Sequence, residues 1–180
     1  NDEYGILEVG MDKKGEIDYL SKIIQPNIGV ITNVNYAHVK NFKNIKQIAL
    51  AKSEIINNIR PNGFVILNAD DNFFGLHKKI ALKKNLKVIS FGIKSKKANI
   101  KMFDIKSSGK VFKIQIKIND KKKYFLISDD FQNNIYNILS TIAVISVYKD
   151  IYKLDKNIFY NFKIPSGRGD YLKIKIKNKK

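Results

Sequence analysis

The sequence has no cysteine or tryptophan, and only three prolines, two histidines and two arginines among its 180 residues. Without cysteine the chain can form neither a disulfide framework nor a cysteine-ligated metal centre, and this composition fits a reducing compartment. No apolar run approaches the roughly 18 residues that a membrane-spanning helix needs, and no signal peptide opens the chain. These absences exclude a disulfide scaffold and predict no membrane span.

Positive charge is abundant, with 34 Lys and Arg against 16 Asp and Glu and a net charge of +18. Such a balance is typical of nucleic-acid partners. Almost all of it is lysine, however, whereas arginine makes most base and phosphate contacts. The lysines are also scattered along the chain in short runs, which favours a solvated basic surface. A nucleic-acid-binding α/β module stays as an alternative, and it predicts binding that weakens steeply with salt.

Apolar runs alternate with segments of helical spacing over the first two-thirds of the chain. Strands are predicted at residues 4–9, 28–34, 64–68 and 87–91. Helices are predicted at residues 15–24, 45–59 and 73–84. Continuous apolar strands alternating with helices are typical of a parallel sheet covered on both faces. Ligands bind such sheets at the carboxyl ends of the strands.

The pattern changes near residue 98. Residues 100–118 and 123–127 alternate strictly between apolar and polar, which predicts an antiparallel flap at about 98–128 with one wet face. Helices are predicted at residues 134–148 and 156–162, followed by a loop and a strand at 171–176. The predicted fold is therefore an α/β domain, with a mostly parallel sheet flanked by helices and a small antiparallel β insertion.

Two polar side chains follow the first two predicted strands. Glu8 closes an apolar run just before Gly10, and a carboxylate is costly to bury there unless it is paired or binds a cation. His38 lies in the loop after the second strand, where Thr32 and Asn33 shape the turn. Because parallel strands end at one edge, Glu8 and His38 could converge on one metal ion. Taken singly, Glu8 is explained equally well as an exposed strand-end acid, and His38 is explained better as a capping or core histidine.

Lys52 lies within the apolar stripe of the helix predicted at 45–59, four residues after Ile48 and three before Ile55. The sequence therefore predicts that this lysine points inward. Snorkelling along the apolar surface is the ordinary explanation. A desolvated lysine also loses its proton easily and becomes reactive.

Polar residues near the carboxyl end of the chain complete the candidates. Asn134 and Asn137 open an apolar helix three residues apart, and N-capping explains only one of them. Arg168, between two glycines, is suited to bind a phosphate or carboxylate. Asp70 and Asp71 close the strand at 64–68, where metal binding, ribose binding and a plain turn are all open.

Several of these elements occur in the order seen in the Mur ligase family of ATP-dependent amide ligases. They are Glu8-x-Gly10, Gly15-Glu16-Ile17, Thr32-Asn33, Ala37-His38, AKSEI at 51–55, NADD at 68–71, Asn134-x-x-Asn137 and Pro165-x-Gly167-Arg168. The chain resembles the central, P-loop-type ATP-binding domain from end to end. Its GEI-x-YLS segment resembles the members that add D-alanyl-D-alanine. The same segment argues against a folylpolyglutamate-synthase or cyanophycin-type relative, which stays as the alternative within this class.

The resemblance implies roles for individual residues. Glu8, His38 and a carbamylated Lys52 would be Mg²⁺ ligands, and His38 and Lys52 would serve catalysis. Asn134 and Asn137 would hold the adenine of ATP, and Arg168 its phosphates.

The resemblance also implies a cytoplasmic, monomeric parent enzyme of peptidoglycan precursor synthesis, and thus of cell-wall growth and division. It would join D-alanyl-D-alanine to a UDP-N-acetylmuramoyl-tripeptide through an acyl phosphate. No nucleic acid would take part.

Two departures from the family pattern qualify these expectations. The phosphate loop G-x-x-G-K-T/S is absent, and no histidine precedes Asn134 where the family usually has L-P-G-x-H-N. We expect residues 1–165 to form a partial central domain and 166–180 to begin a carboxy-terminal ligase domain, without the amino-terminal UDP-binding domain. Such a piece should not turn over alone. A phosphate loop encoded upstream in the parent would rule out a non-catalytic homologue.

Overall fold

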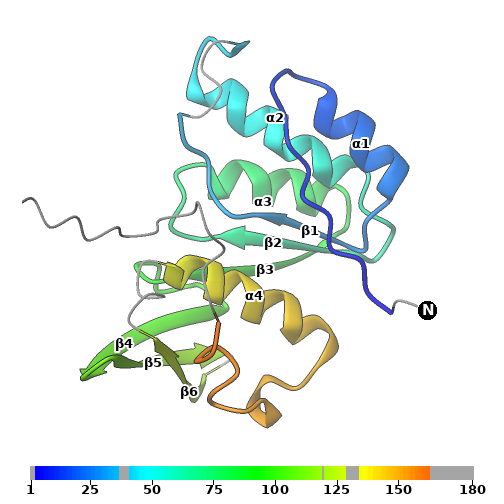
Figure 1. Cartoon of the computed structure of the whole chain (residues 1–180). Helices are drawn as coiled ribbons and strands as arrows, with labels where there is room; N and C mark the ends of the chain where they lie inside the picture. The colour runs from blue at the N-terminus through cyan, green and yellow to red at the C-terminus, as the bar shows by residue number, and fades with distance from the viewer. Residues whose placement is uncertain (1–2, 37–40, 119, 129–133, 163–180) are drawn as a thin grey trace, which may run out of the picture.

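A computed structural model describes residues 3–36, 41–118, 120–128 and 134–162 (Figure 1). Its helices are α1 (Glu16–Ile24), α2 (Ile45–Asn57), α3 (Phe74–Lys83), α4 (Ile135–Tyr148) and the 3₁₀ turn η3 (Ile151–Lys153). Its strands are β1 (Ile28–Ile31), β2 (Phe64–Asn68), β3 (Lys87–Gly92), β4 (Ile100–Ser108), β5 (Val111–Ile118) and β6 (Lys121–Ser128). The six strands form one sheet in the order β1-β2-β3-β4-β5-β6.

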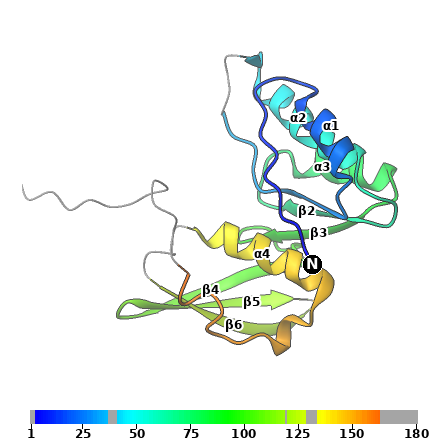
Figure 2. The same ribbon diagram turned by 45° about the vertical axis from the view of Figure 1, so that its right-hand side comes forward.

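The sheet changes character at β4. Strands β1, β2 and β3 run parallel, and β3 meets β4 through only two residue pairs, Phe91 with Ile100 and Gly92 with Lys101. Strands β4, β5 and β6 are antiparallel and form the flap. Helices α1, α2 and α3 lie on one side of the parallel strands and α4 on the other (Figures 1 and 2). The predicted mixed α/β fold is confirmed.

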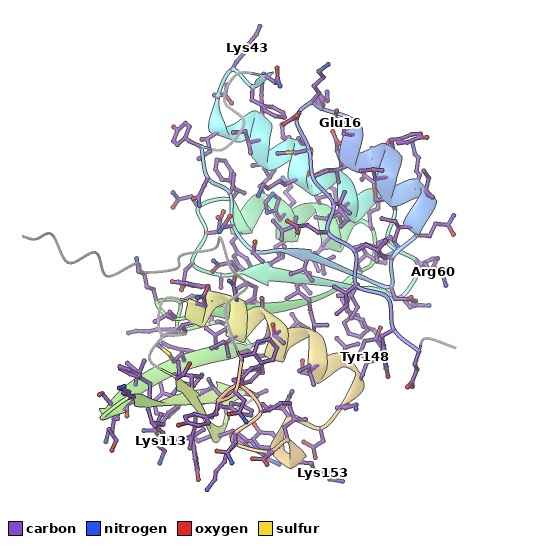
Figure 3. All side chains as sticks on the ribbon, viewed as in Figure 1. Glu16, Lys43, Arg60, Lys113, Tyr148 and Lys153 are labelled. Carbon is purple, nitrogen blue, oxygen red and sulfur yellow. The ribbon has the colours of Figure 1, made fainter. Side chains whose placement is uncertain are left out.

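Apolar side chains fill the space on both sides of the sheet. The largest cluster joins α4 to β3 and the flap, with Phe91, Phe125 and Leu139 fully buried. One smaller cluster packs α2 and α3 against β1 and β2. Another packs α1, α2 and α3 against residues 9–11 and Val34. The flap has the predicted wet face, since Ile114 is buried while Lys113 lies exposed on its outer side (Figure 3). The alternation of β5 is thus explained by one covered face.

The strand predicted at residues 4–9 is wrong, since the structure has no strand there. Strands need a neighbour for their backbone groups, and among the described strands β1 pairs only with β2. Ile6 is 97% exposed, and the Tyr4 ring instead packs edge-on against Tyr148 at the end of α4, 5.3 Å between centroids. The apolar run alone therefore does not make a strand.

The helix predicted at residues 156–162 is also wrong, because this segment forms successive turns. The Lys156 carbonyl accepts a hydrogen bond from the Leu126 amide of β6, 2.8 Å, and Phe159 is buried in the core. These tertiary contacts fix the segment in turns rather than a helix. The strand predicted at 171–176 lies outside the described residues. Across the part of the chain that the structure describes, no helix has the length and apolarity needed to cross a membrane.

Candidate functional site

The parallel strands bring their carboxyl ends to one edge of the sheet, because Ile31 pairs with Leu67, and Asn68 with Phe91. Loop 32–36, turn 69–73 and loop 93–99 follow these three ends. The first turn of α4 reaches the same edge from the other face. This edge is where ligands bind in parallel α/β sheets.

Side chains from three different segments hold loop 32–36 at three consecutive residues. The Asn68 amide at the end of β2 donates to the Thr32 carbonyl, 3.1 Å. Lys52 Nζ on α2 donates to the Asn33 carbonyl, 2.9 Å. The Asp71 Oδ2 atom accepts from the amide of Val34, 2.8 Å. The path of the loop is thus fixed from outside, while His38, four residues further on, lies outside the described residues.

Lys52 occupies the inward position that the stripe predicts and is half-buried. Burial lowers the pKa of its ammonium group below the ordinary value, while the negative charge of Asp71 opposes that shift. The amine of Lys52 therefore loses its proton more readily than a surface lysine. A neutral amine is the nucleophilic form of the side chain.

His77 is a residue of this region that the sequence reasoning missed. It is 2% exposed on α3, and its Nε2 atom donates to the carbonyl of Ala49 on α2, 3.0 Å. Burial lowers its pKa, as does the nearby charge of Lys52, whereas the hydrogen bond to Ala49 and the charge of Asp71 act in the opposite sense. A neutral imidazole thus joins α3 to the helix that carries Lys52. Its place in the apolar spacing of residues 73–84 was the available signal.

Asp70 and Asp71 form the turn that is one of the alternatives for the NADD segment. Asp71 Oδ1 accepts from the Phe73 amide, 2.8 Å, as in an Asx-turn. The Asp70 carboxylate accepts from three successive amides after β3, those of Ile93 at 2.6 Å, Lys94 at 3.0 Å and Ser95 at 2.7 Å. Both carboxylates thus serve the backbone.

The Asp70 carboxylate also accepts from the hydroxyl of Tyr136 on α4, 3.0 Å. Burial raises the pKa of Asp70, but the three amides and the hydroxyl outweigh it and hold that pKa below its usual value. Burial raises the pKa of Tyr136, and the contact with Asp70 raises it further, to about 12. The bond thus joins an ionised carboxylate to a neutral phenol.

Asn134 and Asn137 lie together at the start of α4, as their spacing predicts, because the Asn137 amide donates to Asn134 Oδ1, 3.2 Å. The predicted side-chain cap is wrong, since Asn134 precedes the helix but makes no capping bond. Capping needs an extended backbone, whereas Asn134 has φ −106° and ψ 19°. Asn137 is exposed, so part of this amide pair faces solvent.

The predicted metal ligands are only partly placed. Glu8 is exposed and lies in the segment that forms no strand, and His38 and Arg168 lie outside the described residues. Within the residues described, no three histidine or acidic side chains gather as a metal site would require. The ligand set of Glu8, His38 and Lys52 stays a prediction.

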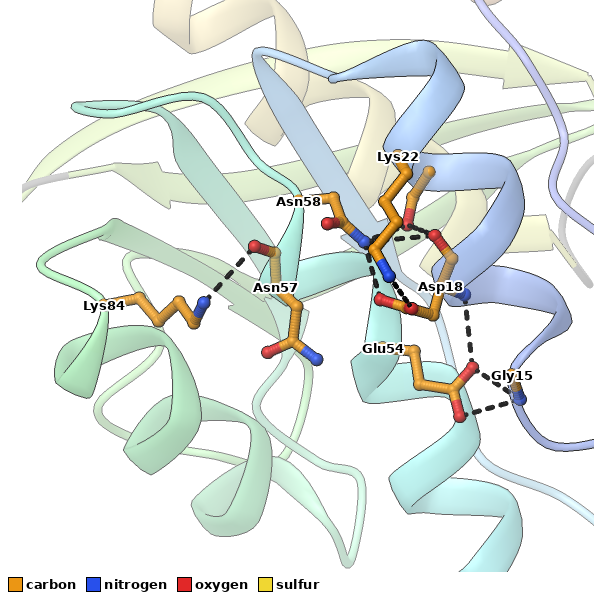
Figure 4. Close-up of polar contacts among 8 residues, drawn as sticks. Gly15, Asp18, Lys22, Glu54, Asn57, Asn58 and Lys84 are labelled. Atoms are coloured by element: carbon orange, nitrogen blue, oxygen red, sulfur yellow. Dashed lines mark hydrogen bonds and ion pairs between the residues drawn. The ribbon is translucent and has the colours of Figure 1, made fainter.

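Glu54, two residues after Lys52, has a separate task (Figure 4). Both of its oxygens accept from the Gly15 amide at 3.0 Å, and Oε2 also accepts from the Asp18 amide at 3.2 Å. These amides open α1, so a carboxylate on α2 caps it from 39 residues away. Gly15 suits this place because its φ of 92° is left-handed. The GEI and KSE elements therefore pack against one another.

Comparison with known protein families shows which class of protein this chain belongs to. The sequence matches the Mur ligase middle domain over residues 1–145. The chain therefore belongs to the Mur ligase family.

Individual proteins of known name are also similar to this chain. The UDP-N-acetylmuramoyl-tripeptide–D-alanyl-D-alanine ligase of Rickettsia prowazekii is 34% identical over 181 residues, which cover 96% of this chain and 38% of that protein. The MurF structure from Acinetobacter baumannii is similar with a TM-score of 0.69 and 26% identity, over 79% of this chain and 30% of that one. MurF from Thermotoga maritima, in complex with ADP, shares the fold with a TM-score of 0.64 and 20% identity, over 74% and 30% of the two chains.

Proposed function

We propose that this chain is the central, nucleotide-binding part of an ATP-dependent ligase that joins D-alanyl-D-alanine to a UDP-N-acetylmuramoyl-tripeptide. The rickettsial relative, similar along 96% of the chain, carries that name. The observation that carries the proposal is Lys52, a half-buried lysine whose amine reaches the Asn33 carbonyl at the ligand-binding edge.

Lys52 is suited to become a carbamate. Its lowered pKa favours the neutral amine, whose nitrogen attacks carbon dioxide, forms one N–C bond and releases one proton to solvent. The product keeps one N–H, so the hydrogen bond to the Asn33 carbonyl can persist. The change turns an inward cation into an anion whose two oxygens extend beyond the nitrogen. An anionic oxygen ligand at this position is what Mg²⁺ prefers.

Glu8, His38 and the Lys52 carbamate would together hold Mg²⁺. The two carboxylate-type groups fit the ion's preference for oxygen, and Lys52 lies at the required edge. When bound, the ion offsets negative charge on the transferred phosphate. Asn68, Lys52 and Asp71 hold loop 32–36 at this edge.

Asn134 and Asn137 would bind the base of ATP, and Arg168 its phosphates. The Asn137 side chain is exposed at the start of α4, where its amide can donate and accept toward a base edge. The structure of the Thermotoga relative contains ADP. The acyl phosphate made with ATP would then be attacked by the amine of D-alanyl-D-alanine, in a monomeric enzyme of the cytoplasm.

The test uses the full-length protein that carries this chain. Ligation is measured as ADP release that depends on both the tripeptide substrate and D-alanyl-D-alanine. Lys52→Ala is expected to abolish it, and added bicarbonate should not restore it, whereas Lys46→Ala, an exposed lysine on the same helix, should leave it intact. Wild-type activity in the Lys52 variant would remove this residue from the mechanism.

The carbamate has its own readout. Protein equilibrated with ¹³C-bicarbonate should show a carbamate carbon resonance that disappears in Lys52→Ala and remains in Lys46→Ala. A wild-type protein that ligates without this resonance would refute the carbamate but not the ligase.

A further inference from the structure

We propose that Asp70 is a positioning residue for nucleotide binding, and that it acts through the Tyr136 hydroxyl on the start of α4. This inference rests on the proposed function, because it takes Asn134 and Asn137 as the residues that bind the base. It assigns a role to the NADD segment and to Tyr136 that the ligand assignments above do not use.

The geometry around Asp70 is more complete than a surface turn requires. Its two oxygens receive three successive backbone amides and one hydroxyl, all between 2.6 and 3.0 Å. Bonds to an ionised acceptor are about twice as strong as neutral ones. The carboxylate is therefore held in one place by loop 93–95 and can serve as a fixed reference point for Tyr136.

Gly92 shows how closely the backbone approaches this carboxylate. A Cβ atom at residue 92 would lie 2.9 Å from Asp70 Oδ1. Glycine leaves room for the carboxylate at the end of β3, where any larger side chain would displace it. Residues 92–95 therefore lie closely around the Asp70 carboxylate.

Tyr136 lies between the two asparagines in sequence, within the first turn of α4. The hydrogen bond from its hydroxyl to Asp70 fixes the position of that turn relative to the end of β2. The same segment holds the opposite side of the edge, since Asn68 and Asp71 bond loop 32–36. Residues 68–71 therefore fix the first turn of α4 and loop 32–36 relative to each other.

The test compares Tyr136→Phe with Tyr152→Phe in the full-length protein. Tyr152 is the control, since its hydroxyl also donates hydrogen bonds, in this case to the backbone carbonyls of Ile118 and Lys121 in the flap, away from the edge. Without this bond the first turn of α4 is no longer held, and ATP binding must order it at a cost of up to about 1.5 kcal/mol, the strength of a hydrogen bond to a charged group, or roughly tenfold in affinity. The expected result is a roughly tenfold rise in KM for ATP in Tyr136→Phe, with kcat and the KM for D-alanyl-D-alanine unchanged. Tyr152→Phe should change none of these constants.

A second measurement does not depend on ligase activity. In amide NMR spectra of this chain, Tyr136→Phe and Asp70→Asn should shift the same residues, both in loop 93–95 and in the first turn of α4. If the two variants perturb separate sets, or if Tyr136→Phe leaves the KM for ATP unchanged in an active enzyme, the positioning role is wrong. An enzyme without ATP-dependent activity, but with the shared NMR pattern, would refute the proposed ligase function while leaving the mechanical link intact.

Discussion

Asp71→Ala is expected to destabilise the chain by about 1.5–4.5 kcal/mol, more than an ordinary turn substitution. The variant loses two acceptors, the one for the Phe73 amide at 2.8 Å and the one for the Val34 amide at 2.8 Å. Val34 is 6% exposed, so its amide is left without an acceptor in a place that water hardly reaches. An orphaned buried donor costs about 1–3 kcal/mol, and the local turn bond adds about 0.5–1.5 kcal/mol.

Asp155→Ala is the matched control for this prediction. Asp155 makes the same local turn, with Oδ1 accepting from the Asn157 amide at 2.8 Å, but it is exposed and has no counterpart to the Val34 contact. We expect a loss of about 0.5–1.5 kcal/mol there. Urea unfolding followed by circular dichroism measures both variants. Equal losses would show that the long-range bond to loop 32–36 contributes nothing.

Three further predictions concern other contacts. Glu54→Ala should lower the free energy of unfolding by about 1–2 kcal/mol, because the amides that open α1 lose their acceptor. Glu54→Gln should lose less, and equal urea midpoints for wild type and Glu54→Ala would contradict this prediction. Burial and Asp70 raise the pKa of Tyr136 to about 12, so its contribution to stability is complete below the unfolded-state value near pH 10 and is lost toward pH 12. Phenolate absorbance should show a component that titrates near pH 12 and that Tyr136→Phe removes. Gly92→Ala should displace the Asp70 carboxylate and speed amide exchange in loop 93–95, whereas Gly75→Ala, with nothing within 4 Å of the added Cβ, should not.

Local chemistry made much of the fold predictable. The apolar run of β2 is bounded by Gly63 and the NADD turn, and the structure has that strand at the predicted bounds, Phe64–Asn68. Helix α2 follows from its stripe and from Asn44, whose side chain accepts from the Gln47 amide as an N-cap. The inward direction of Lys52 follows from the same periodicity.

Other features depend on partners that periodicity does not contain. A strand at residues 4–9 would need a neighbouring strand, and among the described strands β1 pairs only with β2. The carboxylates of Glu54 and Asp70 are set by backbone amides of loops far away in sequence, so their acidity alone gave no sign of their roles. Sequence reasoning therefore predicted the inward direction of Lys52 and the shared edge of the strand ends, but not the side chains that hold that edge together.

The sheet order has a consequence for how the chain can acquire its structure. Each described strand lies beside its predecessor and its successor in the chain, from β1 to β6. Among these six described strands, none has to be inserted between two that are already paired. Short sequence separation between contacting residues speeds folding, and the flap is built from two consecutive hairpins. This part of the sheet can therefore grow in one direction as a ribosome delivers the chain, each new strand pairing with the one made before it.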